Sequence, residues 1–395
     1  MKILYIHQYF RKPEQGGALR SYYLSQALVA AGYEVELITA YNGPSYYQEK
    51  TDGILVHYLP VAYTNNFSFA HRIKAFLKFT WQSLQLAFRI KNISLCYATS
   101  TPLTVGLVPL VLKKFKQIPY FFEVRDLWPK APIQLGYIQN SLVKKLLYSF
   151  ECFLYRQADK VIALSPGIAQ GIKPHKTAAD IALIPNMADC DFYRFSAMPR
   201  RKFSEPFFIG YFGAMGVANH LDFLLAAAQA CQLNNLPQVK FILAGEGAEA
   251  ERLQAQAKQL QLRNITWLGP LNREETRICL SSVHATYTSF HTYPVLQTNS
   301  PNKFFDSLAA GKLTIVNTRG WLQELVQKHN CGFHADPNGP KDFIQQLKPY
   351  LENSEMLQQA QQQARNLAEK EFSRQLLPRR FLTLFPASAP ARQPA

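Results

Sequence analysis

Two features that other protein classes depend on are missing from this 395-residue sequence. The six cysteines lie far apart, so none forms the C-x-x-C pair of a zinc or redox site, and we expect reduced core residues of a cytoplasmic protein. No uninterrupted apolar run reaches about 18 residues, which argues against a membrane-spanning helix. The first ten residues hold only a short apolar run and predict a strand rather than a signal peptide.

Acidic residues are missing from one long stretch. Between Asp52 and Glu123 there is no Asp or Glu but there are eight Lys or Arg, in a chain with a net charge of +16. A patch of this kind is typical of proteins that bind nucleic acid or an anionic membrane surface. Within the patch, residues 72–90 have the periodicity of an amphipathic helix.

The apolar residues of this helix help to separate the two kinds of partner. The spacing predicts a core stripe of Ile73, Phe76, Leu77, Leu84 and Phe88, which leaves Phe79, Trp81 and Leu86 on other faces beside the lysines. Aromatic rings next to basic groups favour a membrane interface over nucleic acid. Residues 142–156 form a second apolar helix with basic flanks. A helix buried on two sides remains the alternative.

Strands and helices alternate along the chain. A strand at 2–6, a loop ending in Gly16-Gly17, a helix at 18–31 and a strand at 35–39 form a first β-α-β unit, which lacks the G-x-G-x-x-G of NAD-binding proteins. The same rhythm returns further on, so we predict an α/β protein with two doubly wound parallel-sheet domains. The expected divisions are a domain at 1–185, a linker at 186–206, a domain at 207–385 and a disordered tail at 386–395.

The stretch S-P-N-K-F-F-D-S-L-A-A-G, residues 300–311, predicts a short helix with one apolar face that Gly311 ends in a left-handed conformation. Lys303 and Asp306 are three residues apart and lie on one side of it. A helix start and a lysine attract a diphosphate, and a carboxylate can accept bonds from the vicinal hydroxyls of a ribose. The pair therefore suits a sugar nucleotide. The alternative is a capped surface helix with a salt bridge between Lys303 and Asp306.

A charged pair follows another strand. The sequence R-D-L-W-P begins with Arg125 and Asp126, directly after the strand predicted at 120–124. Active sites of parallel sheets are built at the carboxyl ends of the strands, so we expect this pair to face a substrate. A structural ion pair between Arg125 and Asp126 is the alternative.

Together these motifs resemble the family 4 glycosyltransferases of the GT-B fold, and N-S-P-N-K-F-F-D with L-A-A-G resembles bacterial cell-surface polysaccharide transferases similar to the fucosamine transferases. The resemblance covers nearly the whole chain. It implies two Rossmann-like domains facing across a cleft, with the donor nucleotide on the C-terminal domain and the acceptor on the N-terminal one. Asp306 matches the second of the family's two acidic positions, where a carboxylate holds the ribose, whereas the first position is Thr298.

The same resemblance implies roles for further residues. In the N-terminal domain, Gly16, Gly17 and Arg20 approach the donor phosphates and the acceptor, and Asp126 orients or deprotonates the acceptor hydroxyl beside Arg125. In the C-terminal domain, the donor-binding residues are Gly213, His220, Gly245, Glu246, Asn302, Lys303 and Asp306. The family's Arg and Lys that bind the diphosphate are replaced here by Ala214 and His220, so Lys303 is expected to substitute for them.

The triplet Asp189-Cys190-Asp191 matches the D-x-D pattern of metal-dependent glycosyltransferases. It follows Ile-Pro-Asn, which in GT-B enzymes opens the interdomain linker, and the metal-binding D-x-D belongs to another fold. We therefore expect no metal and no cofactor.

The sequence thus predicts a retaining glycosyltransferase that moves a sugar from a nucleotide donor, by resemblance a UDP-sugar such as a UDP-N-acetyl deoxy-hexosamine. The expected acceptor is a lipid-linked saccharide, with the enzyme peripheral at the inner face of the cell membrane and no nucleic acid partner. Two alternatives remain. One is a GT-B sugar-nucleotide epimerase or hydrolase, and the other is a non-catalytic membrane-surface binding protein.

Overall fold

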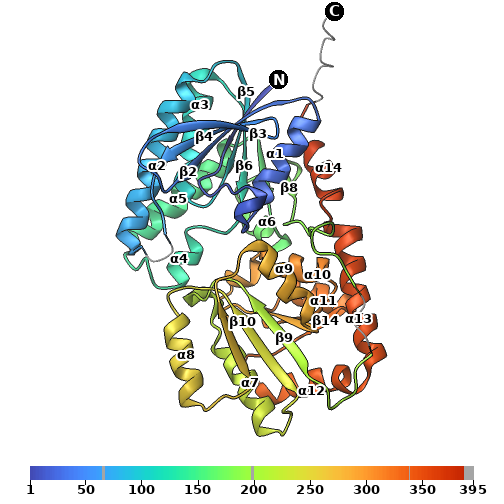
Figure 1. The fold of residues 1–395 in the computed structure, drawn as a ribbon. Coiled ribbons are helices and arrows are strands. Elements are labelled where there is room, and N and C mark those ends of the chain that lie inside the picture. The colour runs from blue at the N-terminus through green and yellow to red at the C-terminus, as the bar shows by residue number, and fades with distance from the viewer. Residues whose placement is uncertain (65–66, 197–199, 338, 387–395) are drawn as a thin grey trace, which may run out of the picture. The chain divides into compact units, whose positions relative to one another are not determined.

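The computed structural model describes residues 1–64, 67–196, 200–337 and 339–386, and it divides into two compact units (Figure 1). The first unit comprises Met1–Pro185, Thr298–Ser300 and the segment from Leu377 onward, and the second comprises Asn186–Gln297 and Pro301–Leu376. The sequence analysis had assigned the segment after Leu377 to the second domain. Apart from Pro386, the tail that it expected to be disordered lies outside the described residues.

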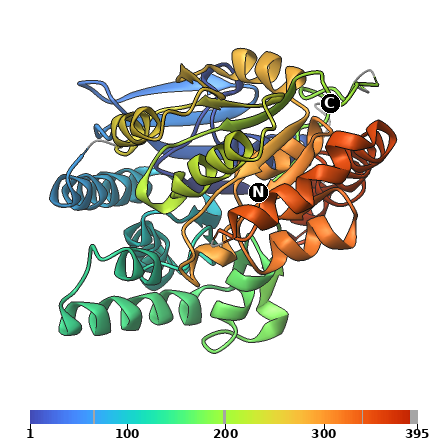
Figure 2. The ribbon, with the colours of Figure 1, turned by 90° about the horizontal axis from the view of Figure 1, so that it is seen from below.

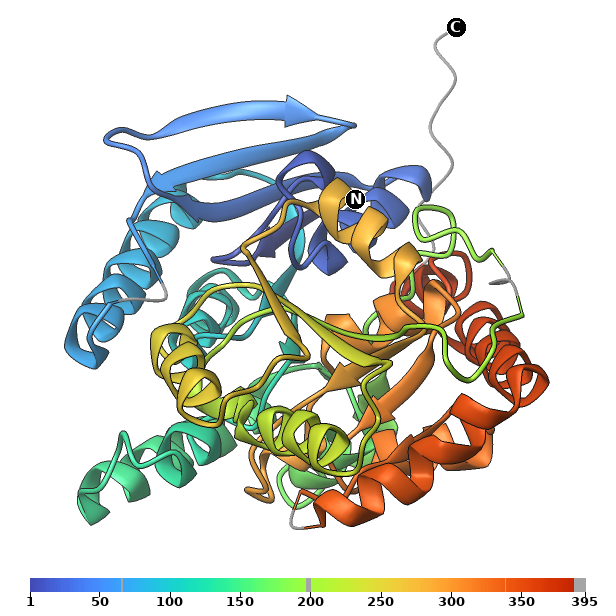
Figure 3. The same cartoon turned by 60° about the horizontal axis from the view of Figure 1, so that its bottom comes forward.

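The first unit is built on an eight-stranded sheet in the order β3-β4-β2-β1-β5-β6-β7-β8. All neighbouring strands are parallel except β3, which forms an antiparallel hairpin with β4 at the edge of the sheet (Figure 3). The sequence analysis missed β3 because Y-Q-E-K-T is a polar, exposed edge strand without an apolar face. The strands are β1 (Lys2–Ile6), β2 (Glu34–Tyr41), β3 (Tyr47–Thr51), β4 (Ile54–Pro60), β5 (Ile93–Thr99), β6 (Tyr120–Val124), β7 (Lys160–Ala163) and β8 (Ile181–Leu183).

Helices cover this sheet on both faces. Helix α3 packs against β5 and β6 and lies between α2 and α5, so these three helices form one layer (Figure 2). The rings of Phe381 and Phe385, from the end of the chain, pack against Tyr97 of β5. The helices are α1 (Arg20–Ala30), α2 (Phe69–Arg89), α3 (Leu107–Lys116), α4 (Lys130–Gln134), α5 (Ser141–Gln157), α6 (Pro166–Ile172) and α14 (Leu376–Leu382), with short turns η1 (Pro13–Gln15), η2 (Leu103–Gly106) and η3 (Ala178–Asp180).

The second unit is built on a six-stranded sheet, all parallel, in the order β11-β10-β9-β12-β13-β14. Its strands are β9 (Phe207–Phe212), β10 (Val239–Ala244), β11 (Ile265–Gly269), β12 (Ala285–Thr288), β13 (Leu313–Val316) and β14 (Gly332–His334). Its helices are α7 (Asp222–Leu233), α8 (Ala250–Gln259), α9 (Arg273–Ser282), α10 (Asn302–Ala309), α11 (Trp321–Lys328), α12 (Pro340–Glu352) and α13 (Ser354–Leu367), with η4 (Val217–Asn219), η5 (Leu296–Thr298) and η6 (Ala368–Phe372). Two doubly wound α/β sheets confirm the predicted fold class.

Candidate functional sites on the two sheets

Helix α10 presents Lys303 and Asp306 on its partly exposed side, while Phe304, Phe305 and Leu308 are completely buried. Gly311 follows it at φ +60°, as predicted. A Cβ atom at Gly311 would lie 2.2 Å from the ring of Phe195, closer than two carbon atoms can approach. The helix and its end therefore form as the sequence indicates.

The Lys303 ammonium group lies in a polar and aromatic setting. Its Nζ donates a hydrogen bond to the hydroxyl of Tyr211 at 2.7 Å and lies 4.3 Å from the centre of that ring. The Tyr211 hydroxyl in turn donates to the carbonyl of Ala214 at 2.6 Å. No described carboxylate contacts Lys303, and burial lowers its pKa to about 7. A cation held in this way lacks the negative partner that would compensate its loss of water.

Asp306 lies one helical turn further along. Its carboxylate accepts no hydrogen bond and joins no ion pair within the part of the chain that the structure describes, so the alternative of a salt bridge between Lys303 and Asp306 is not realised. Burial raises the pKa of Asp306 to about 7, and the nearby Arg273 opposes that rise. Among the described residues neither group joins an ion pair, which makes both of them candidates for contact with a ligand.

Two glycine loops lie beside Lys303. A Cβ atom at Gly213, after β9, would be 3.1 Å from the Lys303 Nζ, and one at Gly245, after β10, would be 1.9 Å from the Gly213 carbonyl oxygen. Only glycine allows this approach. Three N–H groups of these loops already have partners: Gly213 donates to the carbonyl of Ala244, Met215 to Glu246 and Gly245 to Gly269. The loops bring Gly213, Gly245 and the exposed Glu246 together beside Lys303.

His220 takes part in an aromatic stack rather than pointing freely into solvent. Its ring packs against Phe223 at 4.4 Å and against His291 at 4.5 Å, and His291 stacks on Tyr293 at 3.9 Å. The Nε2 atom is 3.9 Å from the carboxylate of Asp222. The sequence analysis missed His291 and Tyr293, which lie in the irregular loop after β12 where no periodicity marks a side chain.

On the first sheet, Arg125 follows β6 and contacts a histidine rather than Asp126. Its Nη1 lies 3.2 Å from the Nε2 of His7, and the Nδ1 of His7 lies 2.8 Å from the hydroxyl of Ser21. Because a guanidinium only donates, Nε2 accepts, and the proton of a neutral His7 sits on Nδ1 and is donated to Ser21. Burial and then Arg125 hold the pKa of His7 well below its usual value. His7 was missed, although it is the first polar residue after β1.

Asp126 is held at the same carboxyl edge. Its carboxylate interacts with the side chain of Thr101, and burial raises its pKa while Arg125 lowers it. No ion pair of 4.0 Å or less joins Asp126 to Arg125 among the described residues, so the structural-pair alternative is not what the geometry shows.

Arg20 is buried and paired within the first unit. Its guanidinium is 3% exposed and pairs with the buried Glu123 at 2.9 Å, and Nη1 donates to the carbonyl of Pro185 at 2.5 Å. The sequence analysis expected Arg20 at the donor phosphates, and this environment gives it a structural role in the first unit instead. Gly16 and Gly17 adopt φ angles of +67° and +78°, which explains why two glycines stand there.

Both carboxylates of Asp189-Cys190-Asp191 are bonded to neighbouring side chains. Asp189 accepts from Arg273 at 2.5 Å and from Arg374 at 2.8 Å, and Asp191 accepts from Gln375 at 2.9 Å. Guanidinium groups thus occupy the oxygens that a metal would need. Among the described residues, no group of His, Cys, Asp and Glu side chains could hold a metal ion.

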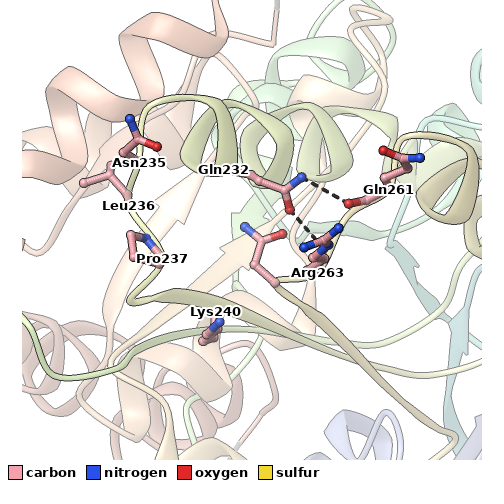
Figure 4. A pocket seen from close by; sticks show the side chains of 8 residues that line it. Gln232, Asn235, Leu236, Pro237, Lys240, Gln261 and Arg263 are labelled. Carbon is pink, nitrogen blue, oxygen red and sulfur yellow. Dashed lines mark hydrogen bonds between the residues drawn. The ribbon is translucent and has the colours of Figure 1, made fainter.

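A pocket opens elsewhere on the second unit, near the start of β10 (Figure 4). The side chain of Gln232 bridges it by donating to the carbonyl of Gln261 at 3.1 Å and accepting from the N–H of Arg263 at 3.0 Å. Lys240 and Asn264 also line it. None of the predicted site residues does, because the pocket lies at the ends of the strands opposite to the glycine loops.

The sheet topology defines a chain of the GT-B fold class, and comparisons with known proteins agree. Residues 15–187 match the family described as "Glycosyl transferase 4-like domain", and residues 196–367 match "Glycosyl transferases group 1". Each match covers less than half of the chain, and together they support a glycosyltransferase. The more specific likeness to fucosamine transferases is not confirmed.

Individual relatives are distant. TuaH of Bacillus subtilis, named as a teichuronic acid biosynthesis glycosyltransferase, is 25% identical over 243 residues, which are 60% of this chain and 59% of that protein. Sucrose-phosphate synthase from Thermosynechococcus elongatus has a TM-score of 0.78 at 17% identity, covering 97% of this chain and 98% of that one. Anabaena HepE, solved with UDP and glucose, has a TM-score of 0.69 at 18% identity, covering 97% and 99%.

Proposed function

We propose that this protein is a retaining glycosyltransferase that moves a sugar from a UDP-sugar to a lipid-linked saccharide in cell-surface polysaccharide biosynthesis. The observation that carries the donor half is the pair Lys303 and Asp306, neither of which joins an ion pair in the described part of the chain. A UDP-sugar supplies both missing partners, because its diphosphate is anionic and its ribose offers two hydroxyl donors.

Lys303 would act on the leaving group. When the bond between sugar and phosphate breaks, negative charge develops on the diphosphate, and a fixed cation nearby lowers the free energy of that state. An arriving diphosphate also favours the protonated lysine, so it raises the pKa of Lys303 from about 7 and ensures that the ammonium is charged. Tyr211 holds the ammonium group in place through its hydroxyl.

On the first unit, Asp126 would orient or deprotonate the acceptor hydroxyl. Burial raises its pKa, which makes the carboxylate a stronger base than an exposed one. Retention of the anomeric configuration follows from the family resemblance, as does the choice of a UDP-N-acetyl deoxy-hexosamine. The name of TuaH and the UDP bound to HepE support a UDP donor and a cell-surface polysaccharide.

The acid-free patch supports the acceptor half, after a correction. Phe79, which we expected to be outside the core stripe, is completely buried, whereas Leu77 is 53% and Phe88 is 41% exposed. The buried side of α2 consists largely of small residues that let the helix pack closely against α3 and η2. The exposed side carries the larger apolar residues, including Trp81 at 61% exposure, next to Lys74.

Helix α5 repeats this arrangement. Leu142 and Leu146 are 65% and 60% exposed, and the exposed Lys145 lies between them. Its one acidic residue, Glu151, is buried, and burial raises the pKa of that carboxyl to about 7. Exposed apolar and basic groups on α2 and α5 have the composition of a surface that binds an anionic membrane.

We define the membrane face as the exposed residues Lys74, Leu77, Lys78, Trp81, Leu142, Lys145 and Leu146. Within the described residues, no helix has the length and apolarity needed to cross a bilayer. The proposal is therefore peripheral binding at the cytoplasmic face of the cell membrane, where a lipid-linked acceptor is accessible.

The test is a thermal-shift screen of the full chain against UDP-, GDP- and dTDP-sugars, followed by transfer assays with the donor that stabilises it. We expect UDP-sugars to raise the melting temperature. Stabilisation by none of them would contradict a nucleotide-sugar transferase. Donor turnover without any acceptor would point to the epimerase or hydrolase.

A further inference from the structure

A run of aromatic rings leads away from the carboxyl edge of the first sheet. The ring of His7 meets Tyr9 at 6.3 Å, Tyr9 meets Tyr63 at 5.0 Å, and Tyr63 meets Phe67 at 6.1 Å. Phe67 then meets His71, in the first turn of α2, at 5.9 Å. Loops from β1 and β4 thus connect the neighbourhood of Arg125 and Asp126 to the start of the membrane face.

A second route joins the same two places. The chain that leaves β6 through Arg125 and Asp126 forms α4 and then reaches Tyr137. The ring of Tyr137 is parallel to that of Phe69, the first residue of α2, with the centres 5.9 Å apart. The two routes also meet at their other end, where Arg125 contacts His7. Both routes therefore run from the carboxyl edge of the sheet to the first turn of α2.

We define the aromatic strip as Tyr9, Tyr63, Phe67, Phe69 and Tyr137. None of these rings is fully buried, and Phe69 and Tyr137 are exposed. Core aromatic residues of this unit such as Tyr5 and Phe122 are buried completely, so packing alone does not account for the strip.

Apart from Asp126, the exposed charged side chains along the aromatic strip are basic. Between Asp52 and Glu151 the only acidic residues are Glu123, which is buried against Arg20, and Asp126. Arg72 lies at the strip, where its Nε donates to the carbonyl of Phe67 at 2.9 Å and its charge acts on the Tyr9 hydroxyl. Further along the same helix come Lys74 and then the apolar part of the membrane face.

We propose that the aromatic strip is the binding site for the acceptor, a saccharide joined through phosphate to a lipid. The order of groups on the protein follows the order of groups in such a molecule. Asp126 faces the reacting hydroxyl, the rings of Tyr9 and Tyr63 contact the sugar, and Arg72 with Lys74 binds the phosphate. The lipid then lies along Leu77 and Trp81.

Physical chemistry supports each assignment. Tyrosine combines an apolar ring face with a hydroxyl, which suits the apolar faces and hydroxyl edges of a sugar. Guanidinium binds phosphate oxygens through two parallel hydrogen bonds. This inference rests on the proposed function and adds to it a path for the acceptor on the first unit.

The experiment measures binding of three probes to the full chain by calorimetry: farnesyl-diphosphoryl N-acetylglucosamine, N-acetylglucosamine 1-phosphate and farnesyl diphosphate. We expect the first probe to bind at least tenfold more tightly than either part. Tyr63→Leu and Arg72→Gln should each weaken it at least tenfold. Tyr9→Phe keeps the ring and removes only the hydroxyl, so it should fold normally and weaken binding a few-fold.

Matched controls lie elsewhere on the first unit. Tyr46→Leu removes an exposed tyrosine near β3, and Lys50→Gln removes an exposed cation from that strand, and both should leave probe binding within twofold. Tyr63→Leu should bind anionic vesicles that contain no probe as well as the wild type does. This comparison separates acceptor binding from attraction to membrane charge. Equal loss in Tyr63→Leu and Tyr46→Leu, or no binding of the first probe to the wild-type chain, would overturn the proposal. UDP binding is measured in parallel and reports on the second unit. A wild-type chain that did not bind UDP would contradict the proposed function rather than the acceptor site.

Discussion

On the second sheet, Lys303 and Asp306 have no described partner of opposite charge, whereas on the first sheet Arg20 pairs with Glu123 and Arg125 contacts His7. Both arrangements place charged side chains at or near the carboxyl ends of parallel strands. Arg20 and Glu123 compensate each other's charge within the fold, whereas Arg125 contacts a neutral histidine. We therefore choose candidate binding residues by the absence of an ion pair among the described residues, and not by position in the fold alone.

The largest expected effect concerns Lys303, a candidate binding residue on the second sheet. Lys303→Met should lower turnover about 100- to 1000-fold, because a preorganised charge at the leaving group is lost. Its melting temperature should stay the same or rise, because the change removes a buried ammonium without a counter-ion. Single-turnover kinetics at saturating donor and a thermal melt measure the two quantities.

Lys312→Met is the matched control. Lys312 is 2% exposed, burial lowers its pKa to about 8, and its Nζ donates to the carbonyl of Ser281 at 2.8 Å. This variant also removes a buried lysine, and it should keep its turnover. If both variants lost turnover equally, Lys303 would have no special role.

The next effect concerns the ribose. Asp306→Ala should weaken UDP binding tenfold to hundredfold, since hydrogen bonds to a charged group contribute about 1.5–3 kcal/mol. Asp306→Glu should keep much of the affinity because the carboxylate remains. Asp189→Ala serves as the contrast, because it breaks bonds to Arg273 and Arg374 and should reduce stability. Calorimetry showing unchanged UDP affinity in Asp306→Ala would mean that α10 does not bind the nucleotide.

A smaller effect tests the membrane face. Lys74→Glu with Lys78→Glu should weaken sedimentation with anionic vesicles roughly 30-fold, at about 1 kcal/mol per basic residue lost from the surface. Lys50→Glu with Lys173→Glu changes the net charge equally at exposed positions outside that face and should have little effect. Binding should also fall as salt is raised, because charges are screened over about 10 Å at 0.1 M. If the two double variants bound the vesicles equally, net charge alone would explain the binding and the membrane face would have no special role.

Much of the fold could be predicted because apolar periodicity marks buried strands and helices. β6 has the predicted bounds, and α10 ends at Gly311 as expected. The buried face of α2 was predicted only in part, because Phe76 is buried as expected whereas Leu77 and Phe88 point outward. The hydrophobicity of a residue identifies the core only where the exposed side of a helix is polar. On α2 this condition fails, because Leu77 and Trp81 are exposed.

Candidate site residues could be predicted only where a motif contains them. Lys303 and Asp306 stand in a recognisable stretch, and their positions on α10 agree with it. The pairing of Arg20 with Glu123 joins residues 103 positions apart, which no local pattern reveals. His7, Tyr211 and the rings of the aromatic strip look like ordinary strand or loop residues in the sequence, and only the folded chain brings them together.

The smallest effect is in the pH dependence of stability. Burial raises the pKa of Asp306 from 3.8 to about 7, so between these values the folded protein binds a proton that the unfolded chain has lost. Stability from this group therefore falls as pH rises from 4 to 7 and is constant above that range. The melting temperature of the wild type relative to Asp306→Asn should fall over the same interval, and thermal melts at four or five pH values measure it.

For Lys303, whose pKa is lowered from 10.5 to about 7, the unfolded chain holds the extra proton, so stability rises from pH 7 to 10.5 relative to Lys303→Met. Saturating UDP should remove both slopes, because the ligand supplies the missing partners. If UDP bound but left both slopes unchanged, these two groups would not contact it.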